Sequence, residues 1–141
     1  MNKQELERII LLPDILLCES IEKEFKKLIS ETKYTNNKNN KNLLTAYFEL
    51  AERQWHTYKL LDLSLLQEID SILITLWDSE CLESTEIIIG IIGMLGLQKT
   101  YDMIKSSISQ KLSEEIKQEI LEAIEEFGDT ITNPYSSLEP S

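Results

Sequence analysis

Four glutamates in the C-terminal third of the chain are spaced so that a helix would gather them into one stripe. They lie at positions i, i+4, i+7 and i+11: Glu115, Glu119, Glu122 and Glu126. On a helix, like charges at i and i+4 cost about 0.2–0.5 kcal/mol per pair, and Lys117 offsets little of this. The spacing predicts a stripe opposite the apolar side of the helix. A cationic partner would relieve the repulsion, whereas the alternative interpretation is an ordinary solvated helix face.

A second acidic cluster surrounds the start of a helix that the sequence predicts from Ser84 or Thr85 onward. It has no basic residue among its members Asp78, Glu80, Glu83 and Glu86. The helix dipole favours carboxylates near a helix N-terminus, which explains part of this cluster. We expect Asp78, Glu80 and Glu83 to bind a partner together with the four-glutamate stripe.

The net charge of the chain is concentrated in its second half. The 141 residues carry a formal charge of −11, and residues 61–141 have 4 basic and 16 acidic side chains. Such a surface repels phosphate backbones, which disfavours direct binding of nucleic acid. It attracts basic proteins and accelerates their encounter with this chain. A basic protein is therefore the partner that composition favours.

Sequence motifs for catalysis and for metal binding are weak. Cys18 and Cys81 form no CxxC pair, and His56 has no nucleophile motif beside it, so we expect no zinc site and no catalytic residues. Glutamate pairs at i and i+3, such as Glu119 and Glu122, resemble the Mg²⁺ ligands of all-α nucleotide pyrophosphohydrolases. Those ligands face the interior of the bundle, whereas this stripe is predicted to face outward. We therefore predict no metal and no cofactor, and keep a Mg²⁺-dependent hydrolase as a less favoured alternative.

Apolar residues recur at helical spacing along most of the chain, which makes the predicted fold class all-α. Pro13 is expected to end the first helix and Asp14 to cap the second. Ser113 is expected to cap the last helix, and Gly96 and Gly128 to end theirs. The pattern predicts about seven helices, near residues 2–12, 14–30, 43–61, 65–77, 84–95, 99–108 and 113–127.

We expect a single helical domain over residues 1–132, followed by a tail at 133–141. Residues 34–42, YTNNKNNKN, are polar and low in complexity, which predicts a mobile loop. The longest apolar run, at 87–97, is about eleven residues, whereas a membrane-spanning helix needs about 20. The start of the chain is not that of a signal peptide, and two thiols without a disulfide framework suit a reducing compartment. These features predict a cytoplasmic protein with no membrane contact.

Glycine and aromatic residues of the second half have predicted packing roles. Gly90, Gly93 and Gly96 are expected to form a ridge of small residues that allows close helix packing. Trp77 and Tyr101 are candidates for interface anchors, although we expect Trp77 in the core. Tyr135 is also a candidate anchor, and its place in the tail predicts exposure.

Two segments of the second half align at a spacing of 32 residues. Ile88, Ile92, Leu95 and Gly96 match Ile120, Ile124, Phe127 and Gly128. A helix, a glycine stop and a second short helix at this period indicate a helix-turn-helix repeat, as in an α-solenoid. The run AIEEFGD resembles the end of the first helix of HEAT-like repeats. The predicted architecture is a short HEAT-like α-solenoid or an irregular helical bundle, and the alternative is two ordinary helices that both end in glycine.

The acidic, repeat-like second half, mainly residues 84–129, resembles HEAT-like all-helical immunity proteins of bacterial polymorphic-toxin and contact-dependent growth inhibition systems. The resemblance implies one cognate toxin, often a basic nuclease, that is held inactive because its active site is occluded. Two alternatives remain from other classes of function. One is a HEAT-like protein-interaction adaptor without a toxin, and the other is the Mg²⁺-dependent nucleotide pyrophosphohydrolase.

Overall fold

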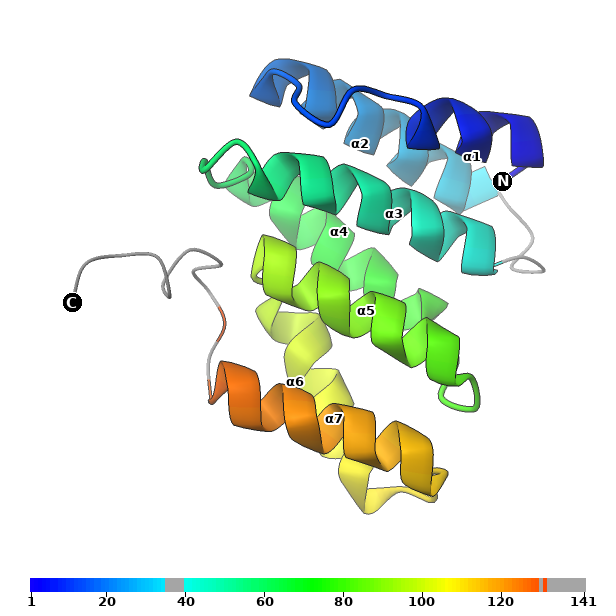
Figure 1. Ribbon diagram of the computed structural model, residues 1–141, viewed down its shortest axis with the longest axis vertical. Helices are drawn as coiled ribbons and strands as arrows, with labels where there is room; N and C mark the ends of the chain where they lie inside the picture. Colours follow the sequence, from blue (N-terminus) through cyan, green and yellow to red (C-terminus); the bar gives the residue numbers. More distant parts are fainter. Residues whose placement is uncertain (35–39, 130, 132–141) are drawn as a thin grey trace.

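The computed structural model describes residues 1–34, 40–129 and 131, and all regular structure in these residues is helical (Figure 1). This confirms the all-α prediction. The elements are α1 (Lys3–Ile10), α2 (Cys18–Tyr34), α3 (Asn40–Trp55), α4 (Leu63–Leu76), α5 (Leu82–Leu95), α6 (Gln98–Ser106), a 3₁₀ turn (Ser107–Ser109) and α7 (Glu114–Phe127).

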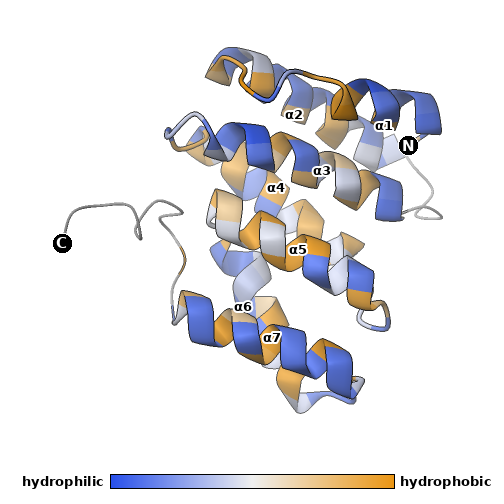
Figure 2. Cartoon of the chain, viewed as in Figure 1, coloured by the Kyte–Doolittle hydropathy of each residue, from blue (hydrophilic) through white to orange (hydrophobic). Residues whose placement is uncertain are grey.

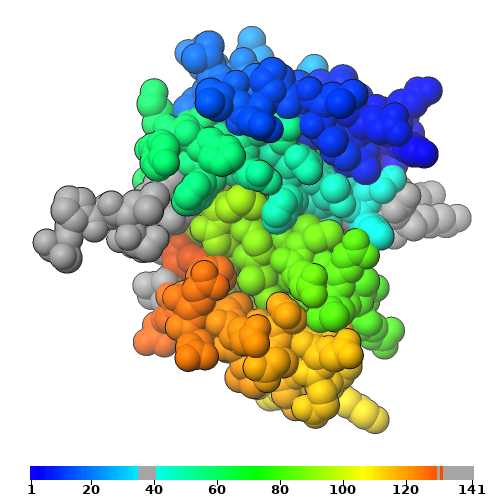
Figure 3. All heavy atoms as spheres, viewed as in Figure 1, coloured from blue at the N-terminus to red at the C-terminus, as the bar shows by residue number. Residues whose placement is uncertain are grey.

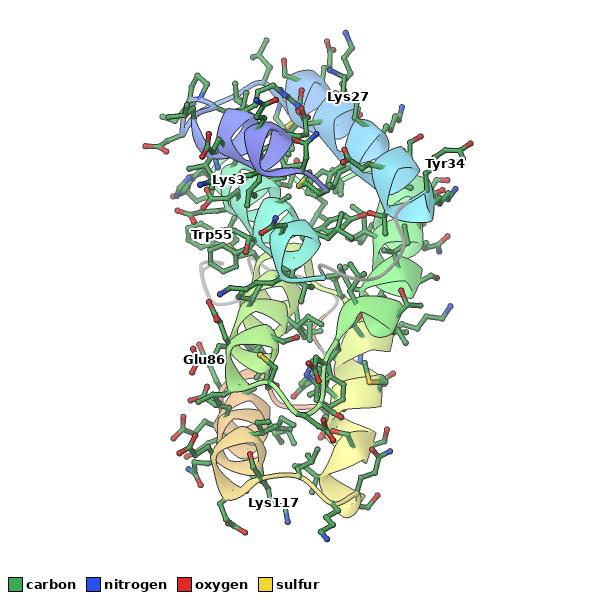
Figure 4. All side chains as sticks on the ribbon, turned by 90° about the vertical axis from the view of Figure 1, so that its right-hand side faces the viewer. Lys3, Lys27, Tyr34, Trp55, Glu86 and Lys117 are labelled. Atoms are coloured by element: carbon green, nitrogen blue, oxygen red, sulfur yellow. The ribbon has the colours of Figure 1, made fainter. Side chains whose placement is uncertain are left out.

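The helices form two layers, seen side by side in Figure 4. The front layer contains α1, α3, α5 and α7, and the back layer contains α2, α4 and α6. In the front layer, α3 packs against α1 and α5, and α5 packs against α7; in the back layer, α4 packs against α2 and α6. Successive helices alternate between the layers, which is the arrangement of a short α-solenoid.

The 32-residue repeat corresponds to two equivalent helices, α5 and α7. Both have 14 residues, both lie in the front layer, and they pack against each other. Each ends at a glycine with positive φ: Gly96 has φ 75° and Gly128 has φ 78°. Each glycine N–H donates to the carbonyl four residues earlier, on Ile92 and Ile124. The two predicted glycine stops are therefore confirmed, because residues other than glycine rarely adopt positive φ.

Two glycines inside α5 receive aromatic rings from the front-layer helices on either side. A Cβ atom added at Gly90 would lie 2.7 Å from Phe48 Cε2 of α3, and one added at Gly93 would lie 2.9 Å from Phe127 Cζ of α7. The predicted small-residue ridge is confirmed at these two positions. Gly96, in contrast, acts as the helix cap.

Replacing Gly90 with leucine should therefore destabilise the fold. Alanine at this position gains about 1 kcal/mol of helix propensity, which offsets the displacement of the Phe48 ring tip. Leucine is too large for that adjustment and should cost about 1–3 kcal/mol through overpacking. Urea unfolding of Gly90→Ala and Gly90→Leu measures the difference, and equal stability of the two variants would contradict the packing described above.

The first part of the chain departs from the predicted helix boundaries. Asp14 does not cap α2, because residues 11–17 form an irregular connection and α2 begins at Cys18. The predicted loop at 34–42 is wrong at both ends: Tyr34 closes α2, and residues 40–42 belong to α3. α3 ends at Trp55, earlier than predicted. Residues 35–39, the predicted tail 133–141 and Tyr135 lie outside the described residues.

The start of α5 also differs from the prediction. Its N-cap is Cys81, whose Sγ accepts the Ser84 N–H, so neither Ser84 nor Thr85 caps the helix. These two side chains are buried and hold the preceding segment. Thr85 Oγ1 accepts from Trp77 Nε1 at 3.0 Å, and Ser84 Oγ accepts from the Asp78 N–H at 3.1 Å. Trp77 is partly buried against the core, as expected.

The last helix of the described chain agrees with the prediction at both ends. Ser113 caps α7 and accepts from the Ile116 N–H. Beyond α7, the Tyr101 hydroxyl donates to the Gly128 carbonyl, and Ile131 is buried with its N–H donated to Gln98 Oε1 at 2.8 Å. Tyr101 is buried, so it packs in the core and is not an interface anchor.

A buried arginine fixes the connection between α1 and α2. Arg53 of α3 is only 4% exposed. It donates to the carbonyls of Ile10, Leu12 and Pro13 at 3.1, 2.7 and 3.0 Å, and to Glu49 Oε2 at 2.9 Å. The planar guanidinium has five N–H donors, which suits it to this set of acceptors. Arg53 therefore determines where α1 ends relative to α3.

The other arginine of the chain, Arg8, attaches α1 to α2. Its Nη2 lies 2.5 Å from Glu24 Oε2 of α2 and 2.7 Å from Glu5 Oε1 of α1. The hydrogen bond from Arg8 lowers the pKa of Glu5. Both arginines thus hold the N-terminal helix on the stack.

An aspartate of α4 caps the start of α6 in the back layer. Asp70 accepts from the Lys99 and Thr100 N–H groups at 2.9 and 2.7 Å, and from Thr100 Oγ1 at 2.6 Å. The first N–H groups of a helix have no partner within the helix. Asp70 supplies that partner from a distant part of the sequence and so joins α4 to α6.

Candidate protein-binding face

The carboxylates of α7 lie beside the residues that hold this helix on the stack. Ile116, Ile120 and Ala123 are buried and fix the rotation of α7. Of the predicted stripe, Glu115, Glu122 and Glu126 are exposed and Glu119 is half-buried. The prediction that the stripe lies opposite the apolar side is therefore wrong for Glu119.

Glu119 lies near a carboxylate of the neighbouring front-layer helix. Burial raises the pKa of Glu119, and the negative charges of Glu86 on α5 and Glu122 on α7 raise it further. We call Glu86, Glu119 and Glu122 the front acidic cluster. Figure 4 shows Glu86 directed away from the back layer, on the outer side of the front layer. The cluster concentrates negative charge across the boundary between two helices.

Two predicted site residues around the start of α5, Asp78 and Glu83, have local partners. Glu83 Oε2 lies 2.9 Å from Lys41 Nζ of α3, so a cation already accompanies this carboxylate. Asp78 Oδ1 accepts from the Glu80 N–H at 3.0 Å, which shapes the connection between α4 and α5. Asp78 and Glu83 thus contribute to the structure around the start of α5, whereas Glu80 takes part through its backbone N–H. Of the second acidic cluster, Glu86 is the residue whose charge acts on Glu119 of α7.

Glu86 is not among the predicted site residues. Its position in the sequence groups it with the acidic cluster at the helix start. The 32-residue repeat contained the signal that was needed, since it aligns Glu86 with Gln118, the neighbour of Glu119. Equivalent helices of a solenoid lie side by side, so equivalent positions come close together.

Replacing Glu119 with glutamine should stabilise the isolated protein above the pKa of this carboxyl. Because the pKa of this carboxyl is raised in the folded state, the charged form of Glu119 lowers the free energy of unfolding at high pH. This destabilisation disappears once the pH falls below the pKa that the carboxyl has in the unfolded chain. We expect Glu119→Gln to gain about 0.2–0.5 kcal/mol at about pH 7 and nothing at about pH 3. Urea unfolding at both pH values measures this. Glu114→Gln is an exposed control in the first turn of α7, with Lys111 and Lys117 rather than carboxylates at i−3 and i+3. It should show no such gain, and equal gains would contradict the assignment.

Other chemistry finds little support in the described residues. No three His, Cys, Asp or Glu side chains of this part of the chain gather closely enough to hold a metal ion. Glu49 binds Arg53, and His56 lies against Trp55 with ring centroids 5.8 Å apart. No helix in the described ranges is long and apolar enough to cross a membrane.

A groove of about 620 Å³ lies in the back layer, between α4 and α6. Its lining is mixed in character and includes Leu63, Leu66, Asp70, Lys99 and Asp102. Asp70 is already engaged by the N–H groups of α6. The front acidic cluster lies on the other layer, so the groove and the cluster are separate features.

Comparison of the chain with protein-family models, with curated proteins and with solved structures finds no match. What the structure shows is an all-α stack of two helical layers, with acidic residues on the α5 and α7 part of the front layer.

Proposed function

We propose that this chain is an immunity protein, which binds a cognate bacterial toxin and occludes its active site. The observation that carries the proposal is the front acidic cluster, where the negative charges of Glu86 on α5 and Glu122 on α7 act on the half-buried Glu119. Grouping like charges in this way costs stability in the free protein. A basic partner turns the same charges into favourable contacts.

The proposed mechanism has two physical parts. Complementary charge raises the rate at which the acidic face and a basic toxin meet. Carboxylates of the front layer then take the positions that substrate phosphates occupy on a basic nuclease, and the bulk of the helical stack blocks access. Slow dissociation requires close packing as well as charge. The proposed location is the cytoplasm of the cell that makes the toxin.

Two alternatives remain less supported. A protein-interaction adaptor would use the same fold, and identification of the partner separates it from an immunity protein. A Mg²⁺-dependent hydrolase needs carboxylates that converge on a cation. Further glutamate pairs at i and i+3 are Glu49 with Glu52 and Glu80 with Glu83. Arg53 engages Glu49 and Lys41 engages Glu83, so these two carboxylates already have other partners.

The test is capture of the partner on the tagged protein from its native cells, followed by mass spectrometry. The proposal predicts one stoichiometric basic protein that stops growth when expressed alone and is harmless when this chain is present. Several housekeeping proteins at low yield would favour the adaptor. A rise in melting temperature with Mg²⁺ alone would favour the hydrolase, since ligands that bind the folded state stabilise it.

A further inference from the structure

Large apolar side chains are exposed in two segments of the front layer. In the connection between α1 and α2, Leu11 and Ile15 are each 82% exposed and Leu17 is 76% exposed. In the turn after α3, Tyr58 is 67% and Leu60 is 61% exposed. We call these five residues the apolar patch. Clustered apolar exposure of this kind marks interaction sites more often than scattered single residues do.

The two segments lie next to each other. Arg53, in the last turn of α3, donates to the carbonyls of Ile10, Leu12 and Pro13 and so holds the connection against the end of α3. In the space-filling view the connection (blue) and the turn after α3 (green) are neighbours, and α7 (orange) is visible on the same side of the molecule (Figure 3). Figure 2 shows hydrophobic colour at both ends of the connection.

Both segments are held in fixed conformations. Arg53 binds the carbonyl groups of the connection, while the side chains of Leu11 and Ile15 face solvent. In the turn, Gln54 Nε2 donates to the Lys59 carbonyl at 2.8 Å, and the Lys59 N–H donates to Thr57 Oγ1 at 3.1 Å.

The turn also places Tyr58 at φ 57°, in the left-handed region that tyrosine rarely adopts. The exposed apolar side chains of this turn add little to the core. Because the turn is already held in one conformation, less conformational entropy is lost when a partner binds it, which favours affinity.

We propose that the apolar patch is the second contact of the same basic partner, and that it receives apolar side chains flanked by cationic residues. This inference rests on the proposed function. Two observations favour that occupant over a second copy of this chain. The two segments of the patch are visible on the same side of the molecule as α7, and the exposed carboxylate of Asp14 lies in the connection. Asp62, at the end of the turn that contains Lys59, is also exposed, although its Oδ2 caps α4 by accepting the Leu65 N–H. The acidic cluster sets the rate of association, and the patch sets the rate of dissociation.

Photo-crosslinking in the native cells tests this arrangement. A benzophenone amino acid is placed at Leu11 in one variant, at Glu122 in a second and at Tyr34 in a third. Tyr34 is a matched control, because it is 88% exposed but ends α2 in the back layer (Figure 4). We expect positions 11 and 122 to crosslink the same basic protein and position 34 not to crosslink it.

Each other result is decisive. Crosslinking of the basic protein from position 122 alone would overturn the patch and leave the proposed function standing. Crosslinking of a second copy of this chain from position 11 would show a dimer face and also overturn the patch. No basic protein from either position would overturn the proposed function itself.

A kinetic measurement separates contact from mere proximity. With the crosslinked protein purified as the probe, Leu11→Ser/Ile15→Ser should raise the dissociation rate at least tenfold and leave the association rate unchanged. Tyr34→Ser, the back-layer control, should change neither rate. Unchanged dissociation of the double variant would overturn the inference.

Discussion

Replacing Arg53 with methionine should lower the free energy of unfolding by about 3–5 kcal/mol, because it removes one partner of a buried charged network. The carbonyls of Ile10, Leu12 and Pro13 would lose their donor, and Glu49 would lose its cation. Methionine fills a similar volume, so the loss reports mainly on the hydrogen bonds. Urea unfolding followed by circular dichroism measures it.

Two further variants define the cause of the Arg53 effect. Arg53→Lys keeps the charge but cannot span three carbonyls with one ammonium group, so it should lose about half as much as methionine. Glu49→Gln keeps an acceptor for Arg53 and should lose less than either. A loss below about 1 kcal/mol for Arg53→Met would show that water replaces these bonds without cost.

Replacing Asp70 with alanine should cost about 2 kcal/mol, which is the upper end for loss of a helix cap. The carboxylate accepts from two N–H groups and one hydroxyl at the start of α6, at Lys99 and Thr100. Alanine leaves the two N–H groups without their partner, while the Thr100 hydroxyl can still donate to the backbone carbonyl of residue 70, to which it lies at 2.9 Å. Thermal or urea unfolding measures the loss.

Hydrogen exchange at individual amides distinguishes loss of the α6 cap from general destabilisation of the protein. In Asp70→Ala, hydrogen exchange at the Lys99 and Thr100 amides should accelerate more than exchange in α3. Asp70→Asn keeps one oxygen and should show roughly half the loss. Uniform acceleration across both helices would contradict a cap at α6.

The elements that the sequence predicted well are those set by local interactions. Ser113 precedes the apolar run of its helix and accepts an N–H three residues later. Gly96 and Gly128 follow their helices and adopt positive φ. These signals depend on a few neighbouring residues, so sequence reasoning finds them. The repeat also was visible, because equivalent packing of α5 and α7 selects the same apolar positions.

The features that were missed depend on residues far apart in the chain. Arg53 reaches the connection around Pro13, 40 positions away, and Asp70 reaches Thr100, 30 positions away. Neither contact leaves a local pattern. The same reason explains the wrong start of α2: Asp14 has the chemistry of a cap, but the backbone around it follows the contacts of Arg53.

The sequence predicts the acidic character of the candidate site, but not which carboxylates lie near one another. The spacing of the glutamates predicts the charge density on α7. Which of these carboxylates are turned toward α5 depends on which residues of α7 are buried. Packing brings Glu119 toward Glu86, whereas Glu83 meets Lys41 instead. Sequence proximity had grouped Glu86 and Glu83 together, and the fold separates their roles.

The measurement that tests the central claim most directly is calorimetric titration of the captured basic partner with charge-reversal variants. We predict that Glu119→Lys/Glu122→Lys weakens binding about 100-fold and that the double variant remains folded. Glu114→Lys/Glu125→Lys carries the same charge change at other exposed positions of α7, and should weaken binding much less. Equal affinities of the two double variants would contradict a partner-binding role for the front acidic cluster.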